Sequence, residues 1–322
     1  MRNRITAVAA IAAASALVLG GCTAAEDTGE DAFHIAVFTP GYGAPVGKYA
    51  MDLFIEAGRD LGWEVDLYTS DFDYDKLNND VSAAIRQGVD AVMGGWPDPR
   101  QIGPIITAAE EAGIPIFAFD SGVESTPALA IDVTTSQQQV TDLTVGALEE
   151  AMGGLEGKEV MIIGFDPHLG IGFRGRLAEA QLIEAGAVIA GGDVRQIANP
   201  ATAQEEALKI VTDYLQANPD GLDGVWTAWD QVGLGATLAI NEAGRDDIFV
   251  TGVDGVSGAL DAIKANGPFY ATISQDWQAI VQLVVDAVTI YAENGDLPES
   301  NFVTTEVTLV TRENVDNIEP TD

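Results

Sequence analysis

The feature that most constrains the fold of this chain is a repeated alternation of short apolar runs with longer amphipathic stretches. Most of the runs are apolar on both faces, which is typical of parallel strands buried inside a sheet. The stretches between them have helical spacing: within 75–87, Leu77, Val81 and Ile85 fall on one stripe. Repeated strand–helix units predict an α/β fold with parallel sheets and helices on both faces of each sheet.

The apolar runs form two sets that follow the same plan, with a break near 134–137. We expect the first set of strands at 34–38, 64–68, 91–94, 114–119 and 129–133. We expect the second set at 159–163, 187–190, 224–227, 248–253 and 270–274, and a further strand at 303–310. Helices are expected at 46–61, 75–87, 101–112, 136–152, 173–185, 201–215, 231–243, 256–265 and 276–294. The chain is therefore predicted to form two doubly wound domains that face one another, from about 290 residues beginning near Phe33.

Polar and aromatic side chains follow many of these strands. Doubly wound sheets bind ligands outside the carboxyl ends of their strands, so these residues are the candidates for a site. They are Trp96, Asp98, Asp120, Trp229, Asp230, Asp254, Gln275 and Trp277. Sugars present apolar C–H faces, which suit aromatic rings, and hydroxyl groups, which suit charge-assisted hydrogen bonds. The pattern favours a polyhydroxylated small molecule as the ligand.

Several of these residues also have a purely structural interpretation. Trp226 alternates with its neighbours along a strand and is expected in the core, whereas Trp229 lies past the strand and is expected to contact ligand. Asp230 can cap the following helix or contact ligand, and both interpretations stay open. The capping alternative applies to Asp120 as well, and Trp96 can pack in an interface or stack on a ligand.

The segment 39–47, after the first strand, is rich in glycine and proline. Glycines in a strand-to-helix turn let backbone amides approach an anion, but the spacing is not G-x-G-x-x-G and no ribose-binding acid follows. We interpret the segment as a turn or as a binding loop in which Tyr42 contacts the ligand. No dinucleotide, and no other cofactor, is expected.

Cys22, the only cysteine of the chain, follows a segment typical of an export signal. Two arginines precede an apolar run at 5–19, which is shorter than the roughly twenty residues of a spanning helix. A cysteine directly after small residues resembles the lipobox of bacterial lipoproteins. The resemblance implies a signal peptide at 1–21 and acylation of Cys22. The acidic stretch at 22–32 is then a flexible tether between the lipid and the folded body.

The formal net charge of −35 argues against nucleic-acid partners, because phosphates would repel such a surface. A single cysteine allows no intramolecular disulfide. His34 and His168 are the only histidines, and no nucleophile motif such as G-x-S-x-G occurs. The chain is therefore predicted to hold no metal and to be no enzyme.

Longer motifs carry a family resemblance. They are 87–92 (QGVDAV), 110–116 (EEAGIPI), 215–225 (LQANPDGLDGV), 228–236 (AWDQVGLGA), 251–255 (TGVDG) and 307–315 (VTLVTRENV). Through these motifs the chain resembles the ribose/galactose type of periplasmic binding protein, the sugar-binding component of ABC importers. The resemblance spans roughly 34–317. It implies the type I fold of that family, with two doubly wound parallel-sheet lobes joined by three crossings of the chain.

The resemblance also implies which residues bind ligand. Asp254, Gln275 and Asp120 stand at the family's binding positions, and the arginine that follows the sixth strand corresponds to Arg174. The polar pair after the fifth strand corresponds to Thr134 and its neighbour.

Two departures from the family pattern bear on the ligand. Trp229-Asp230 stands where the family usually has Asn-Asp, and Ser121 stands where it often has arginine. The first change removes an amide and adds a stacking face. The departures argue against ribose and favour a deoxysugar, a polyol, or another pentose or hexose.

The crossings between lobes are implied near Thr134, Gln275 and Asn301. The N-terminal lobe then comprises 33–134 plus 276–301, and the C-terminal lobe 135–275 plus 302–322.

The resemblance predicts a monomeric, lipid-anchored protein outside the cytoplasm, either in the periplasm or on the outer face of the cell membrane. It would capture a sugar-like ligand in the cleft between lobes and deliver it to an ABC permease. A receptor of the same fold that reports to a sensor kinase or a chemotaxis system is the main alternative. A sugar-acting enzyme and a sugar-responsive repressor are further alternatives, and the export signal and the acidity oppose the second.

Overall fold

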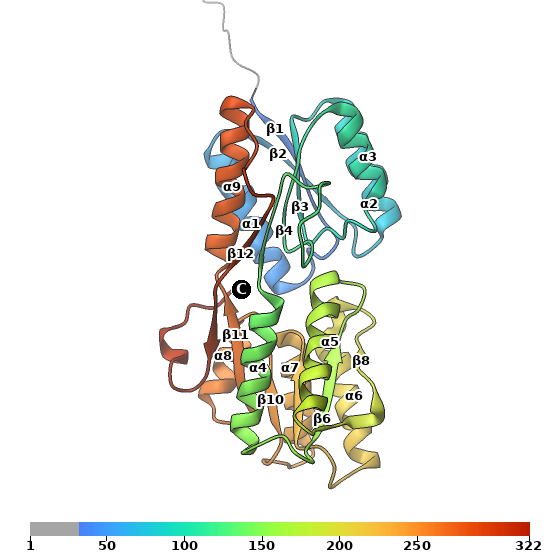
Figure 1. Cartoon of the computed structure of the whole chain (residues 1–322), viewed down its shortest axis with the longest axis vertical. Coiled ribbons are helices and arrows are strands. Elements are labelled where there is room, and N and C mark those ends of the chain that lie inside the picture. The colour runs from blue at the N-terminus through green and yellow to red at the C-terminus, as the bar shows by residue number, and fades with distance from the viewer. Residues whose placement is uncertain (1–31) are drawn as a thin grey trace, which may run out of the picture. The chain divides into compact units, whose positions relative to one another are not determined.

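Two mainly parallel sheets, one above the other in Figure 1, organise the computed structural model, which describes residues 32–322. The predicted signal peptide at 1–21, the acylation site Cys22 and all but the last residue of the tether lie outside the described residues. Within 32–322, no helix combines the length and the apolar character that a membrane crossing requires.

The first sheet has six parallel strands in the order β12-β5-β4-β3-β1-β2. Its strands are β1 (His34–Thr39), β2 (Glu64–Thr69), β3 (Ala91–Gly95), β4 (Ile116–Phe119), β5 (Ile131–Thr135) and β12 (Phe302–Thr305). Its helices are α1 (Pro45–Asp60), α2 (Tyr74–Gln87), α3 (Gly103–Ala112) and α9 (Trp277–Asn294). Alternate residues of β1 face opposite layers: Ile35 and Val37 join the core under α1 and α9, while Ala36 and Phe38 join the core under α2 and α3.

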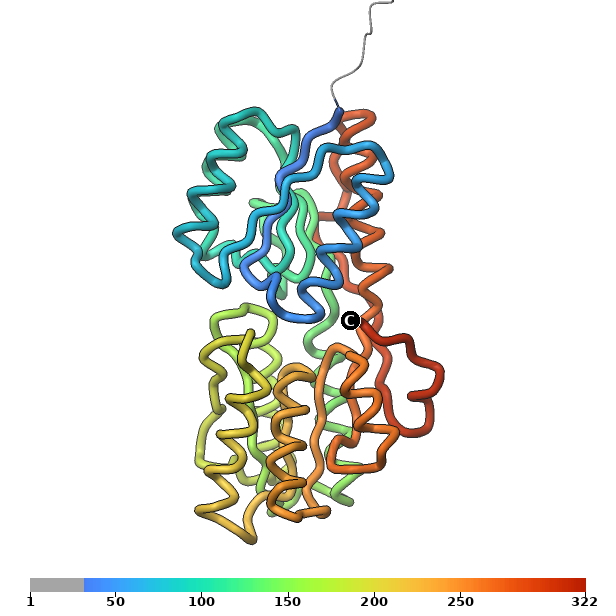
Figure 2. The backbone as a smooth tube through the Cα atoms, turned by 180° about the vertical axis from the view of Figure 1, so that it is seen from behind, coloured from blue at the N-terminus to red at the C-terminus, as the bar shows by residue number. Residues whose placement is uncertain are grey.

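The second sheet has the order β13-β11-β10-β9-β6-β7, with β8 also pairing with β6. Its strands are β6 (Glu159–Gly164), β7 (Val188–Ile189), β8 (Arg195–Gln196), β9 (Gly224–Thr227), β10 (Phe249–Thr251), β11 (Phe269–Gln275) and β13 (Val307–Val310). Its helices are α4 (Gln137–Met152), α5 (Leu169–Glu184), α6 (Ala203–Ala217), α7 (Asp230–Glu242) and α8 (Ser257–Lys264). Helices α4 and α5 cover the face seen in Figure 1, and α6, α7 and α8 cover the face seen in Figure 2. Short 3-10 turns lie at Ala190–Gly192, Pro200–Thr202 and Val315–Asn317.

This architecture confirms the predicted fold class, two doubly wound sheets with helices on both faces, and most predicted elements. Three details differ. Helix α5 begins at Leu169, ahead of the expected 173, because the His168 side chain caps it. The two-residue strand β8 is too short to show a periodicity. The single strand expected at 303–310 is two strands, one in each sheet.

The chain passes between the sheets three times. It passes from β5 into α4, from β11 into α9, and from β12 into β13. The third crossing lies at Glu306 and not at the expected Asn301, because 302–305 still pairs with β5 of the first sheet. The boundary proposed for the two lobes therefore moves toward the C-terminus by the length of β12.

Two of these crossings lead directly into capped helices. Ser136 accepts a 3.2 Å hydrogen bond from the backbone N–H of Gln139 and starts α4. Asp276 accepts one of 2.9 Å from the N–H of Ala279 and starts α9. Because side-chain caps satisfy N–H groups that a helix start leaves unpaired, both helices begin at defined residues right beside the crossings.

Candidate functional site

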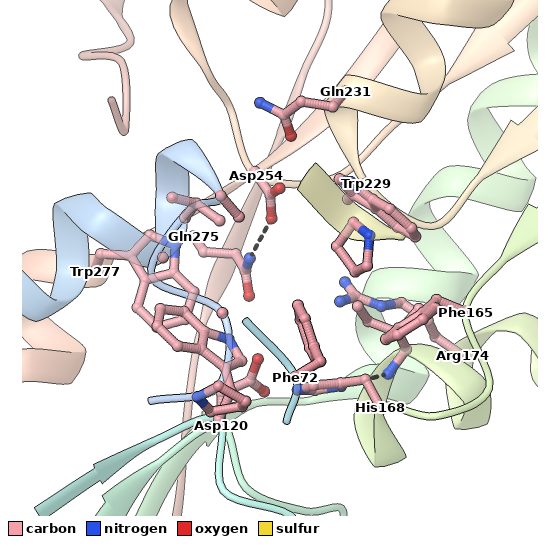
Figure 3. Close-up of a pocket in the computed structure, with 18 residues that line it drawn as sticks. Phe72, Asp120, Phe165, His168, Arg174, Trp229, Gln231, Asp254, Gln275 and Trp277 are labelled. Atoms are coloured by element: carbon pink, nitrogen blue, oxygen red, sulfur yellow. Dashed lines mark hydrogen bonds between the residues drawn. The ribbon is translucent and has the colours of Figure 1, made fainter. Parts of the chain in front are cut away.

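A cavity of about 80 Å³ lies where the carboxyl ends of the two sheets meet. Each part of its lining follows a strand. From the first sheet come Pro40 and Gly41 after β1, Phe72 after β2, Trp96 after β3 and Asp120 after β4. From the second sheet come Phe165 and His168 after β6, Trp229 after β9, Asp254 after β10, and Gln275 at the end of β11. Figure 3 shows the side chains that it labels converging on one space from both sheets. The cavity stands where doubly wound sheets bind ligands.

Asp254 and Gln275 form one polar wall of the cavity. The Gln275 side-chain N–H donates a 3.0 Å hydrogen bond to Oδ1 of Asp254, drawn as a dashed line in Figure 3. Oδ2 of Asp254 has no hydrogen-bond partner among the described residues, although the side chain is only 4% exposed. Burial, followed by repulsion from Asp230, raises the pKa of Asp254 well above its ordinary value. A ligand hydroxyl would provide the missing partner.

Arg174, from α5, brings a positive charge to the wall of the cavity. Its side chain is 3% exposed, and Nε and Nη1 have no hydrogen-bond partner within 32–322. Burial lowers the pKa of Arg174, and attraction to Asp120 and Asp254 opposes that shift. A desolvated guanidinium with free N–H groups is costly unless something binds to it, so Arg174 indicates a hydrogen-bond-accepting ligand.

Asp120 faces the cavity from the opposite sheet. Its Oδ1 accepts a 2.7 Å hydrogen bond from the hydroxyl of Thr134, a buried residue of β5. Thr134 itself does not line the cavity, and its contact with a ligand stays a prediction. The strand β4 leads into β5 with no helix between them, so Asp120 does not cap a helix. Thr134 orients Asp120 from behind.

Aromatic rings form much of the remaining wall. Trp96 packs at 5.0 Å from Phe119 and 5.2 Å from Trp277, measured between ring centroids. Trp96 thus packs against other aromatic rings and also lines the cavity, and its stacking on a ligand stays a prediction. On the other side, Trp229 lies 6.3 Å from Phe165. Trp226, by contrast, is fully buried and donates to Thr144, which confirms it as a core residue.

Two predicted ligand contacts lie elsewhere. Tyr42 does not line the cavity; its hydroxyl donates a 2.6 Å hydrogen bond to Asp52 on α1. Asp230 is fully buried behind the cavity and neither lines it nor caps α7 through its side chain. Its carboxylate instead accepts hydrogen bonds from the backbone N–H groups of Gly255 and Val256. A position beside a strand end does not determine which way a side chain points, and contact of these two residues with a ligand stays a prediction.

Sequence reasoning missed other lining residues, including Phe72, Phe165, His168 and Gln231. Phe165 directly follows β6 and Phe72 follows β2, so the strand-end rule applied to those two strands would have found both. His168 carried no such signal. Its Nδ1 accepts a 3.1 Å hydrogen bond from the N–H of Ile171, which leaves Nε2 to carry the proton of the neutral ring. Burial lowers the pKa of His168 and favours that neutral form.

Backbone strain gathers at this cavity. Among the described residues, seven that are not glycine have a positive φ, and four of these line the cavity: Phe72, Trp96, Asp120 and Asp254. Such conformations cost about 1–3 kcal/mol each and persist where the surrounding structure enforces them, which is common at functional sites. No cluster of metal-ligating side chains is found in the part of the chain that the structure describes.

Two doubly wound sheets with a polar and aromatic cavity between them define the fold class of the type I periplasmic binding proteins. The family model for the periplasmic binding protein domain matches residues 35–296, so the chain belongs to the periplasmic binding protein family. This confirms the resemblance found in the sequence.

Individual relatives agree with the family. The D-apiose import binding protein of Paraburkholderia graminis is 26% identical over 305 residues, which cover 92% of each chain. The xylitol-binding protein of Mycolicibacterium smegmatis is 30% identical over 286 residues, 85% of this chain and 77% of that protein. A solved ABC transporter solute binding protein from Mycobacterium smegmatis, with bound glycerol, has a TM-score of 0.77 and 26% identity, covering 89% of this chain and 96% of that one.

Proposed function

We propose that this protein captures a neutral sugar or polyol in the cavity between its two sheets and delivers it to an ABC permease. The observation that supports this most is the set of buried polar groups without partners, Oδ2 of Asp254 and two nitrogens of Arg174, facing a cavity with aromatic walls. Hydroxyl groups both donate and accept, so one sugar can satisfy a carboxylate and a guanidinium together.

The relatives narrow the class of ligand. Their names specify D-apiose and xylitol, a branched pentose and a five-carbon polyol. The cavity holds both charge signs, Asp120 against Arg174, which suits a neutral ligand better than an ionised one. We therefore propose a pentose or a pentitol, consistent with the departures from the ribose pattern at Trp229 and Ser121.

The proposed cycle uses closure around the ligand. Residues of both sheets line the cavity, so a ligand that contacts both favours the closed arrangement by its difference in affinity for the open and closed states. The three crossings of the chain are the places where such a motion would bend. The closed form then docks on the permease, and acylation at Cys22 keeps the protein near the membrane.

We propose that the protein binds its ligand without altering it. Among the described residues that line the cavity, none carries a hydroxyl or thiol nucleophile, and Nδ1 of His168 is engaged with the backbone of α5. Incubation with the bound sugar followed by chromatography should return the sugar unchanged.

Thermal unfolding in the presence of pentoses, pentitols, hexoses and deoxysugars tests the proposal, because a ligand that binds the folded state raises its apparent stability. The best ligand is then titrated by calorimetry into the parent protein and into Asp254→Ala. We expect Asp254→Ala to weaken binding by about 2–5 kcal/mol. The exposed aspartate of α8 provides a matched control, Asp261→Ala, which should bind like the parent. A Kd unchanged by Asp254→Ala would refute this site.

Lipid anchoring and the role in transport have their own tests. Cys22→Ser should release the protein from the membrane fraction of its natural host, and an unchanged distribution would contradict acylation.

Deletion of the gene should abolish uptake of the labelled ligand. Persistent uptake together with loss of a ligand response would favour the receptor alternative.

A further inference from the structure

The backbone of Asp254 has an unusual conformation that contacts with surrounding residues must enforce. Its φ of 127° is one that L-amino acids rarely adopt. The residue lies between β10 and α8, in a loop that also bridges to Ser274 of β11. A strained residue keeps its conformation only where the surroundings enforce it, so the contacts around this loop decide where the Asp254 carboxylate stands.

Asp230 holds the loop from one side. It is fully buried, and its Oδ2 accepts hydrogen bonds of 2.7 Å from the N–H of Gly255 and 3.0 Å from the N–H of Val256. Its Oδ1 accepts a 2.6 Å hydrogen bond from the hydroxyl of Thr272 on β11. These contacts fix the two residues that follow Asp254, and they leave the carbonyl of Asp254 itself free for another partner.

Thr321 holds the loop through that carbonyl. The Thr321 hydroxyl donates a 2.9 Å hydrogen bond to the carbonyl oxygen of Asp254, and its backbone N–H donates one of 3.2 Å to the carbonyl of Gly255. Only 5% of Thr321 is exposed. The neighbouring Asp322 accepts hydrogen bonds from the N–H and the hydroxyl of Ser257, at the start of α8. In Figures 1 and 2 this C-terminal segment lies beside the junction of the two sheets.

We propose that Thr321 is a positioning residue for ligand binding, which acts by fixing the backbone of Asp254. The inference rests on the proposed function of the cavity. Thr321 does not line the cavity, so its effect on a ligand must pass through Asp254. The backbone of Gly255 packs closely against β11, since a Cβ there would lie 3.1 Å from Ser274. Without the Thr321 hydroxyl, the Asp254 carbonyl loses its hydrogen bond, and the Asp254 carboxylate is held less firmly by Gln275 and the Asp230 contacts alone.

A double-mutant cycle tests this inference. The probe is whichever of D-apiose, xylitol and D-ribose binds tightest to the parent protein by calorimetry. Thr321→Val removes the hydroxyl at nearly constant shape, and we expect a roughly three- to tenfold rise in Kd, the usual effect of one hydrogen bond. Thr321→Ser should restore binding to within about twofold of the parent. In an Asp254→Ala background, Thr321→Val should change Kd by less than about twofold, because the group it positions is gone.

The controls separate this inference from the proposed function. Thr304→Val, at an exposed threonine of β12, should leave Kd unchanged. If Asp254→Ala weakens binding but Thr321→Val does not, the positioning role is wrong and the proposed function stands. An equal effect of Thr321→Val with and without the Asp254 carboxylate would also overturn it, since Thr321 would then act on general stability. If neither these probes nor any sugar or polyol of the thermal-unfolding screen binds, both are wrong. Should Thr321→Val fail to fold, Thr321→Ala is judged by the same criteria.

Discussion

The side chain of Gln275 links Asp254 in the cavity wall to Thr135 at a crossing of the chain. Its N–H donates a 3.0 Å hydrogen bond to Oδ1 of Asp254, and its Oε1 accepts a 3.0 Å hydrogen bond from the hydroxyl of Thr135. Thr135 ends β5, just before the first crossing, and Gln275 ends β11, just before the second. All three residues are buried. A change in the angle between the sheets would therefore move the hydrogen-bond partner of the carboxylate that lines the cavity.

Gln275→Leu should weaken ligand binding. The substitution keeps the volume of the side chain but leaves Oδ1 of Asp254 and the Thr135 hydroxyl buried without this partner, which costs about 1–3 kcal/mol. Calorimetric titration measures the effect. The nearby exposed glutamine provides the control, and Gln278→Leu should bind like the parent. Equal affinities for the two variants would contradict the role given to Gln275.

Arg174→Met should weaken binding without lowering stability. The buried guanidinium has two nitrogens unpaired and a lowered pKa, so the folded protein disfavours its charge. We expect a loss of affinity of about 1.5–3 kcal/mol, typical of hydrogen bonds to a charged group, with an unfolding free energy equal to or above that of the parent. Chemical denaturation without ligand, together with calorimetry, measures both quantities. Arg176→Met, at an exposed position on the same helix, is the control. A clear loss of stability in Arg174→Met would show that the arginine is structural.

Two tryptophans lie near the end of β9, and we expect substitution of Trp226 to lower stability and substitution of Trp229 to weaken binding. Trp226→Leu removes a fully buried indole and its 2.8 Å hydrogen bond to Thr144, and should cost about 2–4 kcal/mol of stability with Kd within about twofold of the parent. Trp229→Leu removes a wall of the cavity and should weaken binding by about 1 kcal/mol or more. Chemical denaturation measures the unfolding free energy of both variants, and calorimetric titration measures their Kd. The assignments would be reversed if Trp226→Leu caused the larger loss of affinity.

Asp132→Asn should change how stability depends on pH. Burial is the main cause that raises the pKa of Asp132 to about 6, against a hydrogen bond from Ser121 that lowers it. Between about pH 4 and pH 6 the folded state therefore keeps a proton that the unfolded state has lost, so the unfolding free energy of the parent falls as pH rises through this window and is level above it. The side-chain amide introduced by Asp132→Asn does not titrate, so it contributes no such pH dependence to the unfolding free energy.

The gain in stability of Asp132→Asn over the parent should thus grow from near zero at pH 4 to at most about 3 kcal/mol at pH 7, as the size of the pKa shift implies. Urea denaturation at several pH values measures it. Asp261→Asn, at an exposed aspartate, should follow the parent throughout. A pH-independent difference for Asp132→Asn would contradict the raised pKa.

The sequence predicted correctly the features that depend on the local apolar pattern and on the topology of the chain. Periodicity placed the helices and most strands, and the strand-end rule selected Asp120, Trp229, Asp254 and Gln275, all of which line the cavity. Asp230, Tyr42 and Thr134 are also close to strand ends, but their side chains hydrogen-bond elsewhere, so their contact with a ligand stays a prediction.

The sequence by itself determined the order of strands and helices, the doubly wound class and the edge of each sheet where the cavity lies. These follow from apolar periodicity and from the handedness of strand–helix–strand units, which act over short stretches of chain. Only the tertiary structure decided which polar side chains face the cavity, that 303–310 divides between two sheets, and that Thr321 bonds to the loop of Asp254. Those outcomes depend on hydrogen bonds and burial between residues far apart in the chain, and no local pattern encodes them.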